Sequence, residues 1–192
     1  MTFASTAGIA AGVIGFIAFV PYIIGTLNHT TRPNKATWII WTVLGIIIAA
    51  SYYASGARDS AWTPIAYAIG ITIVAILSVK YGEEGWTALD KWCLVGAGAG
   101  LALWAITKEP VTAYYLTTIV DATGAVPTIK KAWERPESEI NLAWPMFLVA
   151  NTLNLFAISE WSAAMALYPV YVFILAGTMT VLVYGPRIKK KD

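Results

Sequence analysis

Charged residues in this sequence occur in short clusters, separated by apolar stretches of roughly twenty residues, the length that an α-helix needs to cross a bilayer. Residues 1–31 contain no Asp, Glu, Lys or Arg. Over the whole chain 12% of residues are charged, which is half of the roughly 25% found in an average soluble domain. We therefore expect a polytopic membrane protein rather than a soluble enzyme, a disordered chain or a secreted disulfide scaffold.

Seven apolar stretches fit this description, and each is expected to form a transmembrane helix. A backbone in lipid must satisfy its own hydrogen bonds, which a helix does within one segment. The stretches lack the alternation of polar and apolar residues that a membrane β-strand shows over about ten positions. The predicted spans lie near residues 7–27, 36–56, 61–81, 88–107, 110–129, 140–158 and 162–184.

Lys and Arg residues fall mainly on one side of this topology. Of the 13 in the chain, all but Arg58 and Lys108 fall on the side of the connections that follow the first, third, fifth and seventh spans, with Lys80 and Lys91 at the adjoining ends of the third and fourth spans. Connections rich in Lys and Arg stay in the cytoplasm. We expect the N-terminus outside, the C-terminus in the cytoplasm, and a multi-pass protein of the inner or plasma membrane.

The chain shows a weak internal repeat. A shift of 106 residues places residues 20–23 (Val-Pro-Tyr-Ile) on residues 126–129 (Val-Pro-Thr-Ile), and the same shift places Trp38 on Trp144. Two three-helix units in the same orientation need one extra helix between them, because each unit has an odd number of spans. The predicted division is a first repeat at residues 1–84, a linking helix at 85–109, and a second repeat with a basic cytoplasmic tail at 110–192.

This arrangement of three helices, a linking helix and three helices resembles the SWEET/PQ-loop transporter superfamily. In motif the resemblance rests on the Val-Pro pairs at residues 20–21 and 126–127, and it covers nearly the whole chain in architecture. Tyr22 and Thr128 stand where that family has the glutamine of its Pro-Gln pair. The resemblance implies transport by alternating access, with sugars, amino acids and vitamin-like solutes all known on this fold.

Asp121 is the strongest candidate for a functional residue. It lies at the centre of the fifth span, where an acid costs about 2.5–3.5 kcal/mol on insertion scales and is tolerated mainly beside a partner or a water-filled cavity. Tyr114, Asp121 and Thr128 share one helical face with Thr117 or Thr118 and Ala125. Burial favours the neutral form of a carboxyl group. Asp121 is therefore expected to bind solute and to couple transport to protons, with a structural hydrogen-bonding role as the alternative.

Asn151 and Asn154 lie one turn apart in the sixth span and are expected to bind a polar, uncharged solute. They could instead hydrogen-bond to neighbouring helices, an interaction worth about 0.6 kcal/mol on average in membranes. Trp41 is a candidate stacking platform for a sugar or an aromatic solute. Trp38 and Trp144 are expected mainly to anchor the membrane interface.

Pro21 and Pro127 occupy matching places near the cytoplasmic ends of the first and fifth spans. Each frees a backbone carbonyl and bends its helix. A matched pair of bends suits hinges of a gate, although each bend could also serve only to shape the helix bundle.

Several classes of chemistry find no support in the sequence. One cysteine (Cys93) and one histidine (His29) provide no His/Cys metal cluster, so we expect neither a metal nor a cofactor. Asp121 has no second acid, His or Cys at similar depth, so we expect no enzyme. Residues 81–86 and 134–139 are interpreted as solvated loops, and nothing suggests nucleic-acid binding.

The sequence therefore predicts an all-α membrane transporter for a small polar solute, which Asp121 could couple to protons. Its expected partners are that solute and the lipid bilayer, and association of copies into a homo-oligomer stays open. The alternative is a non-transporting receptor or subunit that uses the same fold to bind a peptide, a lipid or a partner protein. The resemblance does not identify the substrate, because one fold hosts many functions.

Overall fold

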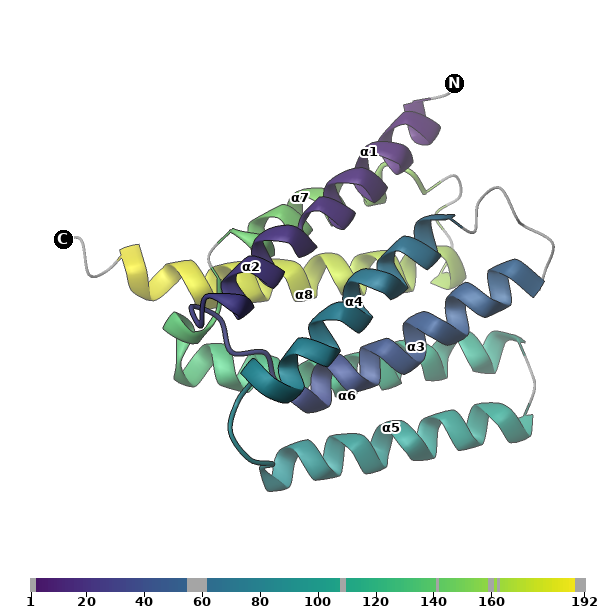
Figure 1. Cartoon of the computed structure of the whole chain (residues 1–192). Coiled ribbons are helices and arrows are strands. Elements are labelled where there is room, and N and C mark those ends of the chain that lie inside the picture. Colours follow the sequence, from purple (N-terminus) through teal and green to yellow (C-terminus); the bar gives the residue numbers. More distant parts are fainter. Residues whose placement is uncertain are drawn as a thin grey trace. The chain divides into compact units, whose positions relative to one another are not determined.

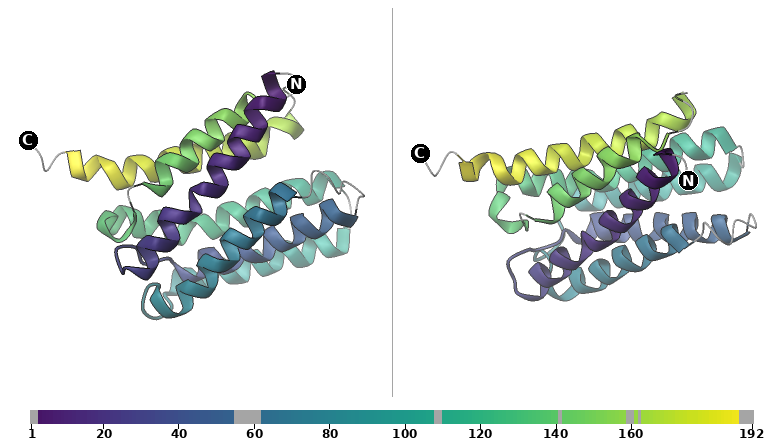
Figure 2. Two further views of the ribbon diagram at one scale, coloured as in Figure 1. Left: turned by 45° about the horizontal axis from the view of Figure 1, so that its top comes forward. Right: turned by 90° about the horizontal axis from the view of Figure 1, so that it is seen from above.

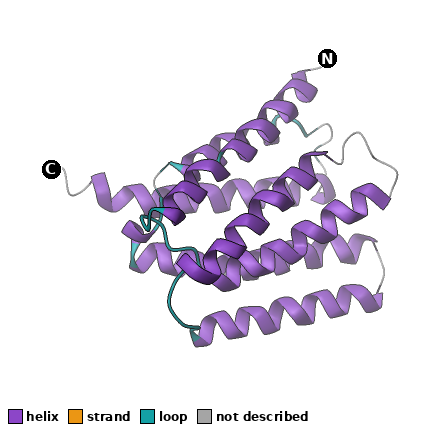
Figure 3. Cartoon of the chain, in the orientation of Figure 1, coloured by secondary structure: helices purple, strands orange, loops and turns teal. Residues whose placement is uncertain are grey.

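The computed structural model describes residues 3–54, 62–107, 110–140, 142–158, 161 and 163–188, which form helices and connecting loops with no strand among them (Figures 1 and 3). The all-helical prediction is confirmed over this part of the chain. The α-helices are α1 (Phe3–Ile17), α2 (Phe19–Leu27), α3 (Lys35–Ala54), α4 (Trp62–Tyr81), α5 (Ala88–Thr107), α6 (Pro110–Glu134), α7 (Ala143–Leu155) and α8 (Ala163–Ile188), and a 3-10 helix, η1, covers Pro136–Ser138.

Two helical stretches among the described residues are long and apolar enough to cross a membrane. They are Thr6–Leu27, which combines α1 and α2, and Ala166–Gly185 within α8. Shorter apolar stretches occur at Lys35–Ile48 in α3 and at Tyr67–Tyr81 in α4. The helices of the seven-span prediction are thus present, whereas length and composition qualify only two of them as membrane spans.

The first predicted span consists of two helices, and Pro21 explains the division. Proline has no amide hydrogen, so the carbonyl group four residues earlier loses its helical partner, and the ring crowds that carbonyl. This carbonyl belongs to Ile17, where α1 ends, and Ala18 separates α1 from α2. Pro127, by contrast, lies inside α6, which continues to Glu134. The two prolines predicted as hinges therefore act differently on their helices.

The chain divides into two compact units. Unit 1 comprises Met1–Thr31 and Lys131–Asp192, and unit 2 comprises Arg32–Lys130. Unit 1 therefore holds α1, α2, η1, α7, α8 and the last residues of α6, whereas unit 2 holds α3, α4, α5 and the rest of α6.

In unit 1, α7 packs against α1 on one side and against α8 on the other. Both views of Figure 2 place α1 alongside α7. Phe3 at the start of α1 meets Phe156, and Phe19 at the start of α2 meets Phe147, with ring centroids 6.3 and 5.2 Å apart. Residue numbers rise along one helix as they fall along the other, so α1 and α2 run antiparallel to α7.

In unit 2, α3 is central and contacts α4 and α5. Gly45 lets α3 approach α4 closely, because glycine has no side chain. A Cβ atom added to Gly45 would lie 3.4 Å from the backbone of Ala68. The opposite face of α3 joins a buried apolar cluster with α5 and α6, formed by Ile40, Leu44, Cys93, Ala97 and Val120. This cluster fixes the part of α6 that precedes Asp121.

The two units cut across the repeats expected from the sequence. Unit 1 combines the first helix of the first predicted repeat with the second and third helices of the second repeat. Unit 2 combines the first helix of the second repeat with the second and third helices of the first, together with the linking helix α5. The repeat boundaries themselves stay a prediction, but each compact unit draws its helices from both repeats.

Candidate functional site

Asp121 is buried within unit 2. Its side chain is 8% exposed and lies midway along α6, between Val120, which belongs to the apolar cluster, and Ala125, which is also buried. Trp41 on α3 donates a hydrogen bond from its Nε1 to the backbone carbonyl oxygen of Asp121 at 3.2 Å. Two of the residues predicted for a solute site, Trp41 and Asp121, are therefore direct neighbours.

The polar face predicted around Asp121 is buried. Thr118 and Thr128 are buried on this face, whereas Ile119 and Val126 are exposed on the opposite face of α6. Tyr114 lies in α6, but its side chain is outside the described part of the structure. Periodicity alone does not say which face of α6 is covered, and the structure shows that it is the face with Asp121.

Gly124 lets α6 approach α3 beside Asp121. A Cβ atom added to Gly124 would lie 2.8 Å from Cγ2 of Ile40 and 3.4 Å from Nε1 of Trp41. Side-chain carbons do not pack at 2.8 Å, so only glycine permits this separation of the two helices. The close approach also brings the indole of Trp41 within reach of the Asp121 carbonyl.

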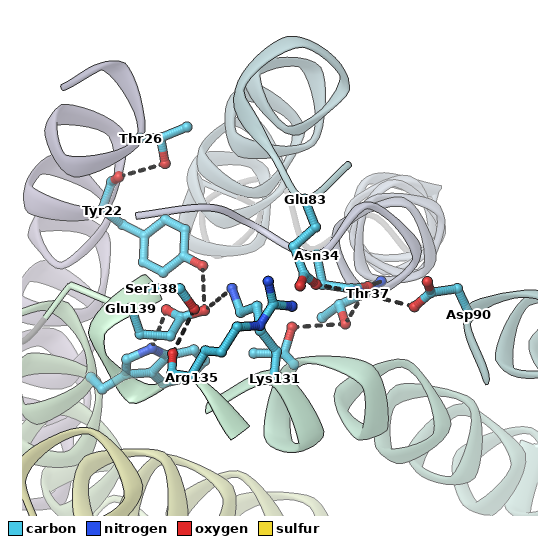
Figure 4. Close-up of polar contacts among 12 residues, drawn as sticks. Tyr22, Thr26, Asn34, Thr37, Glu83, Asp90, Lys131, Arg135, Ser138 and Glu139 are labelled. Atoms are coloured by element: carbon cyan, nitrogen blue, oxygen red, sulfur yellow. Dashed lines mark hydrogen bonds and ion pairs between the residues drawn. The ribbon is translucent and has the colours of Figure 1, made fainter. Parts of the chain in front are cut away.

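A network of hydrogen bonds around Asn34 joins α3, α5, α6 and the loop after α4 in unit 2, and we call it the Asn34 network (Figure 4). The amide nitrogen of Asn34 donates to Glu83 and to Asp90, at 2.9 Å in both cases. Its amide oxygen accepts hydrogen bonds from the backbone and the hydroxyl of Thr37. The Thr128 hydroxyl donates to the Thr37 hydroxyl at 2.9 Å, so the network ends on the polar face that contains Asp121.

The beginnings of α3 and α5 explain how this network forms. Asn34 directly precedes α3, and its side-chain oxygen caps the amide of the third helical residue. Thr87 and Asp90 form a reciprocal capping box at the start of α5: the Thr87 hydroxyl accepts from the Asp90 amide, and Asp90 accepts from the Thr87 amide. Residues that close helix ends thus also supply the buried polar contacts.

A second polar centre lies in unit 1 around Glu139, which is 1% exposed. We call Tyr22, Lys131, Glu139 and Trp144 the Glu139 cluster (Figure 4). Tyr22 on α2 donates from its hydroxyl to Oε1 of Glu139 at 3.2 Å, and Trp144 on α7 donates from Nε1 to Oε2 at 2.8 Å. Lys131, in the last turn of α6 and 2% exposed, forms an ion pair with Oε1.

The Glu139 cluster corrects two interpretations of the sequence. The interpretation of residues 134–139 as a solvated loop is wrong for Glu139, whose carboxylate has three partners within unit 1. The expected anchoring role of Trp38 and Trp144 at the membrane interface is also wrong, because both indoles are buried. The tryptophans that are exposed among the described residues are Trp86, Trp92, Trp133 and Trp161.

Asn151 and Asn154 lie on α7 in unit 1, whereas Asp121 lies in unit 2. Both asparagines are partly buried. The amide nitrogen of Asn151 donates to the carbonyl oxygen of Phe147 in its own helix at 2.8 Å. Because the two asparagines belong to unit 1 and Asp121 belongs to unit 2, a site shared by all three stays a prediction.

The signals for these polar centres were partly present in the sequence. Asn34 and Thr37, and likewise Thr87 and Asp90, have the spacing of helix caps. Glu139 offered no such signal, because it stands among charged, Pro and Ser residues that also make up solvated loops. Across the described residues, no group of three His, Cys, Asp or Glu side chains is placed to hold one metal ion.

Comparisons of the chain with models of protein families, with curated proteins and with solved structures gave no match. The two polar centres and the surface around them therefore carry the information on function.

Proposed function

We propose that the protein is a multi-pass membrane transporter for a small polar solute, such as a sugar, an amino acid or a vitamin-like compound. Two parallel three-helix repeats joined by α5 would carry it by alternating access. We include in it the resemblance to the SWEET/PQ-loop superfamily, which rests on the Val-Pro motifs and on the helix arrangement predicted from the sequence. Three groups of observations support it.

The first support is the apolar surface of the helices. A helix on the surface of a soluble protein turns a polar face outward, and extended exposed apolar patches mark contacts with membranes or proteins. Here exposed residues at helical spacing are apolar along α1 and α2 and along α4. They are Ile9, Val13, Phe16, Val20 and Ile24 in the first case, and Ile69, Ile73, Ile76 and Val79 in the second.

The second support is the position of the charges. Among the described residues, Lys35, Lys80, Lys91 and Lys130 lie within one or two turns of helix ends rather than along the middle of an exposed face. Their clustering on one side of the predicted topology fits a cytoplasmic surface. Four exposed tryptophans fit the aromatic belts that form at membrane interfaces.

The observation that carries the proposal is the burial of Asp121. An acid in the middle of an apolar helix is costly and marks functional positions in membrane proteins by default. Its side chain shares a buried face with threonine hydroxyls and has the indole of Trp41 beside its backbone. This combination supplies a proton-binding group, hydroxyl groups and an aromatic surface, which suits a polar solute and permits proton coupling.

The test is uptake by liposomes that contain the purified protein, with a panel of sugars, amino acids and vitamins. Uptake is compared with and without a proton gradient for wild type and Asp121→Asn. The matched control is Glu137→Gln, which neutralises an exposed acid on η1. Size-exclusion chromatography confirms that each variant is folded.

The expected result is uptake that rises with an inward proton gradient and loses this response in Asp121→Asn only. Uptake that ignores the gradient and persists in the variant would make the protein a facilitator and Asp121 a structural residue. Absence of uptake of any solute by folded protein would contradict transport and favour the receptor or subunit function.

A further inference from the structure

We propose that Lys131 and Glu139 form a charge latch that holds the first part of the α6–α7 connection, residues 135–140, against α2 and must open when the segment after Pro21 moves. Its role in transport depends on the proposed function, whereas its opening can be measured without transport. Lys131, Glu139, Tyr22 and Trp144 are then positioning residues that control the gate and do not touch the solute.

One carboxylate holds three separate elements of unit 1. Oε1 of Glu139 accepts from Tyr22 on α2 and pairs with Lys131 at the end of α6, while Oε2 accepts from Trp144 on α7. Loss of this single negative charge weakens all three contacts together. Such a common dependence is what allows a group of elements to separate in one step.

Burial of the pair indicates a role other than general stabilisation. Lys131 and Glu139 are 2% and 1% exposed, so both charges have lost their hydration. Apolar residues of similar volume in place of a buried ion pair are often neutral or stabilising, whereas loss of one partner is strongly destabilising. A buried ion pair therefore favours the one arrangement in which both charges meet. Each buried charge becomes unfavourable once its partner moves away.

Packing beneath the latch shows how closely the connection rests on α2. Ile140 follows Glu139, and a Cβ atom added to Gly25 would lie 2.7 Å from Cδ1 of Ile140 and 3.0 Å from Oγ1 of Thr31. Thr31 is fully buried, and its hydroxyl has no hydrogen-bond partner among the described residues. Water and reagents reach Thr31 only if the surrounding segments separate.

Thr31 therefore provides a reporter for latch opening. A Thr31→Cys substitution changes one buried hydroxyl that makes no hydrogen bond to the described part of the chain, and Cys93→Ser removes the native thiol from the background. The rate of modification by a membrane-impermeant thiol reagent then follows the population in which residue 31 is open. Hydrogen exchange at residues 22–27 and 136–143 gives the same comparison without any cysteine substitution.

Two matched pairs of variants separate the latch from other charges. Glu139→Gln is compared with Glu137→Gln, and Lys131→Met is compared with Lys130→Met, because Glu137 and Lys130 are exposed neighbours. We expect each latch variant to raise thiol modification at position 31 and exchange at residues 136–143 at least about tenfold, because each removes one partner of a buried ion pair. The control variants should stay within about twofold of wild type.

Removal of both charges completes the test. The double variant Lys131→Met with Glu139→Gln removes both charges of the buried pair, so its opening should lie closer to wild type than that of either single variant. Thermal unfolding in detergent distinguishes a latch from a pair that stabilises the whole protein. A latch variant opens locally at a temperature below its global unfolding transition, where the rest of the protein is still folded.

Equal modification and exchange rates in Glu139→Gln and Glu137→Gln would overturn the latch. So would loss of protection over the entire chain in parallel with residues 136–143, because that result describes general destabilisation. Local opening in a protein that takes up no solute would leave the latch in place and contradict the transport proposal instead.

Discussion

Tyr22 and Thr128 occupy corresponding places in the two halves of the chain, each directly after a proline, and each donates a hydrogen bond to the region where a helix of its own unit begins. The Tyr22 hydroxyl donates to Glu139 at 3.2 Å in unit 1. The Thr128 hydroxyl donates to Thr37 at 2.9 Å in unit 2. Tyr22 thus fastens α2 to the segment that precedes α7 through a charged acceptor, and Thr128 fastens α6 to α3 through a hydroxyl.

This difference predicts unequal effects when each hydroxyl is removed. Tyr22→Phe deletes a hydrogen bond to a charged acceptor, and Thr128→Val deletes one between two neutral hydroxyls. Bonds to charged groups contribute about 1.5–3 kcal/mol and neutral bonds about 0.5–1.5 kcal/mol. We expect Tyr22→Phe to lower the free energy of unfolding more than Thr128→Val does, as measured by denaturant titration in detergent micelles. A larger loss in Thr128→Val would show that the carboxylate adds nothing to the contact in unit 1.

The close approach of α6 and α3 gives a second prediction. Gly124→Ala places a Cβ atom 2.8 Å from Ile40, and such overpacking of a well-filled site costs about 1–3 kcal/mol. Gly98→Ala in α5 is the matched control, because its added Cβ meets no atom within 4 Å. That control should gain up to about 1 kcal/mol from the higher helix propensity of alanine. Equal melting temperatures for the two variants would contradict the packing seen at Gly124.

Features that depend on one segment of the chain could be predicted from the sequence, whereas features that depend on contacts between distant segments could not. The helices were predictable because each is a long apolar run bounded by charges, and the predicted start of the fourth span, residue 88, coincides with the start of α5. The distribution of helices between the two units was not predictable, since it depends on which helix faces match. Trp38 and Trp144 show the same limit: their positions near helix ends favour an interfacial role, whereas neighbours from distant segments bury them.

The polar centres divide along similar lines. Asp121 could be identified from the sequence, because an acid inside an apolar stretch is energetically costly and usually has a function. Glu139 could not, because its partners Tyr22 and Trp144 come from other helices and the composition around it is that of a loop. The sequence shows Lys131 only as one positive charge on the predicted cytoplasmic side, whereas its ammonium group is buried against Glu139. Such contacts between different helices cannot be recognised from sequence spacing, and the buried side chains of the structure identify them.

A third prediction concerns the end of α2. His29 has a backbone φ of 59°, in the left-handed region, while Thr30 and Thr31 donate their amides to the carbonyl oxygen of Gly25. A side chain in this conformation costs roughly 1–2 kcal/mol, which glycine avoids. His29→Gly should therefore raise the free energy of unfolding by about 1 kcal/mol, whereas His29→Ala should not raise it. Thermal unfolding of the two variants in the same detergent checks the sign, and a gain in His29→Ala alone would contradict the explanation.

The last prediction separates the two functions of Trp41, which donates to the Asp121 carbonyl and offers an aromatic face. Trp41→Phe removes the indole N–H but keeps an aromatic ring, so we expect a loss of about 1 kcal/mol in unfolding free energy and an unchanged KM for solute uptake. Trp41→Ala also removes the ring, and the loss of a stacking surface should raise KM. Trp92→Phe is the matched control, because this indole is 73% exposed on α5. A KM that is the same for wild type and both Trp41 variants would assign Trp41 a purely structural role beside Asp121.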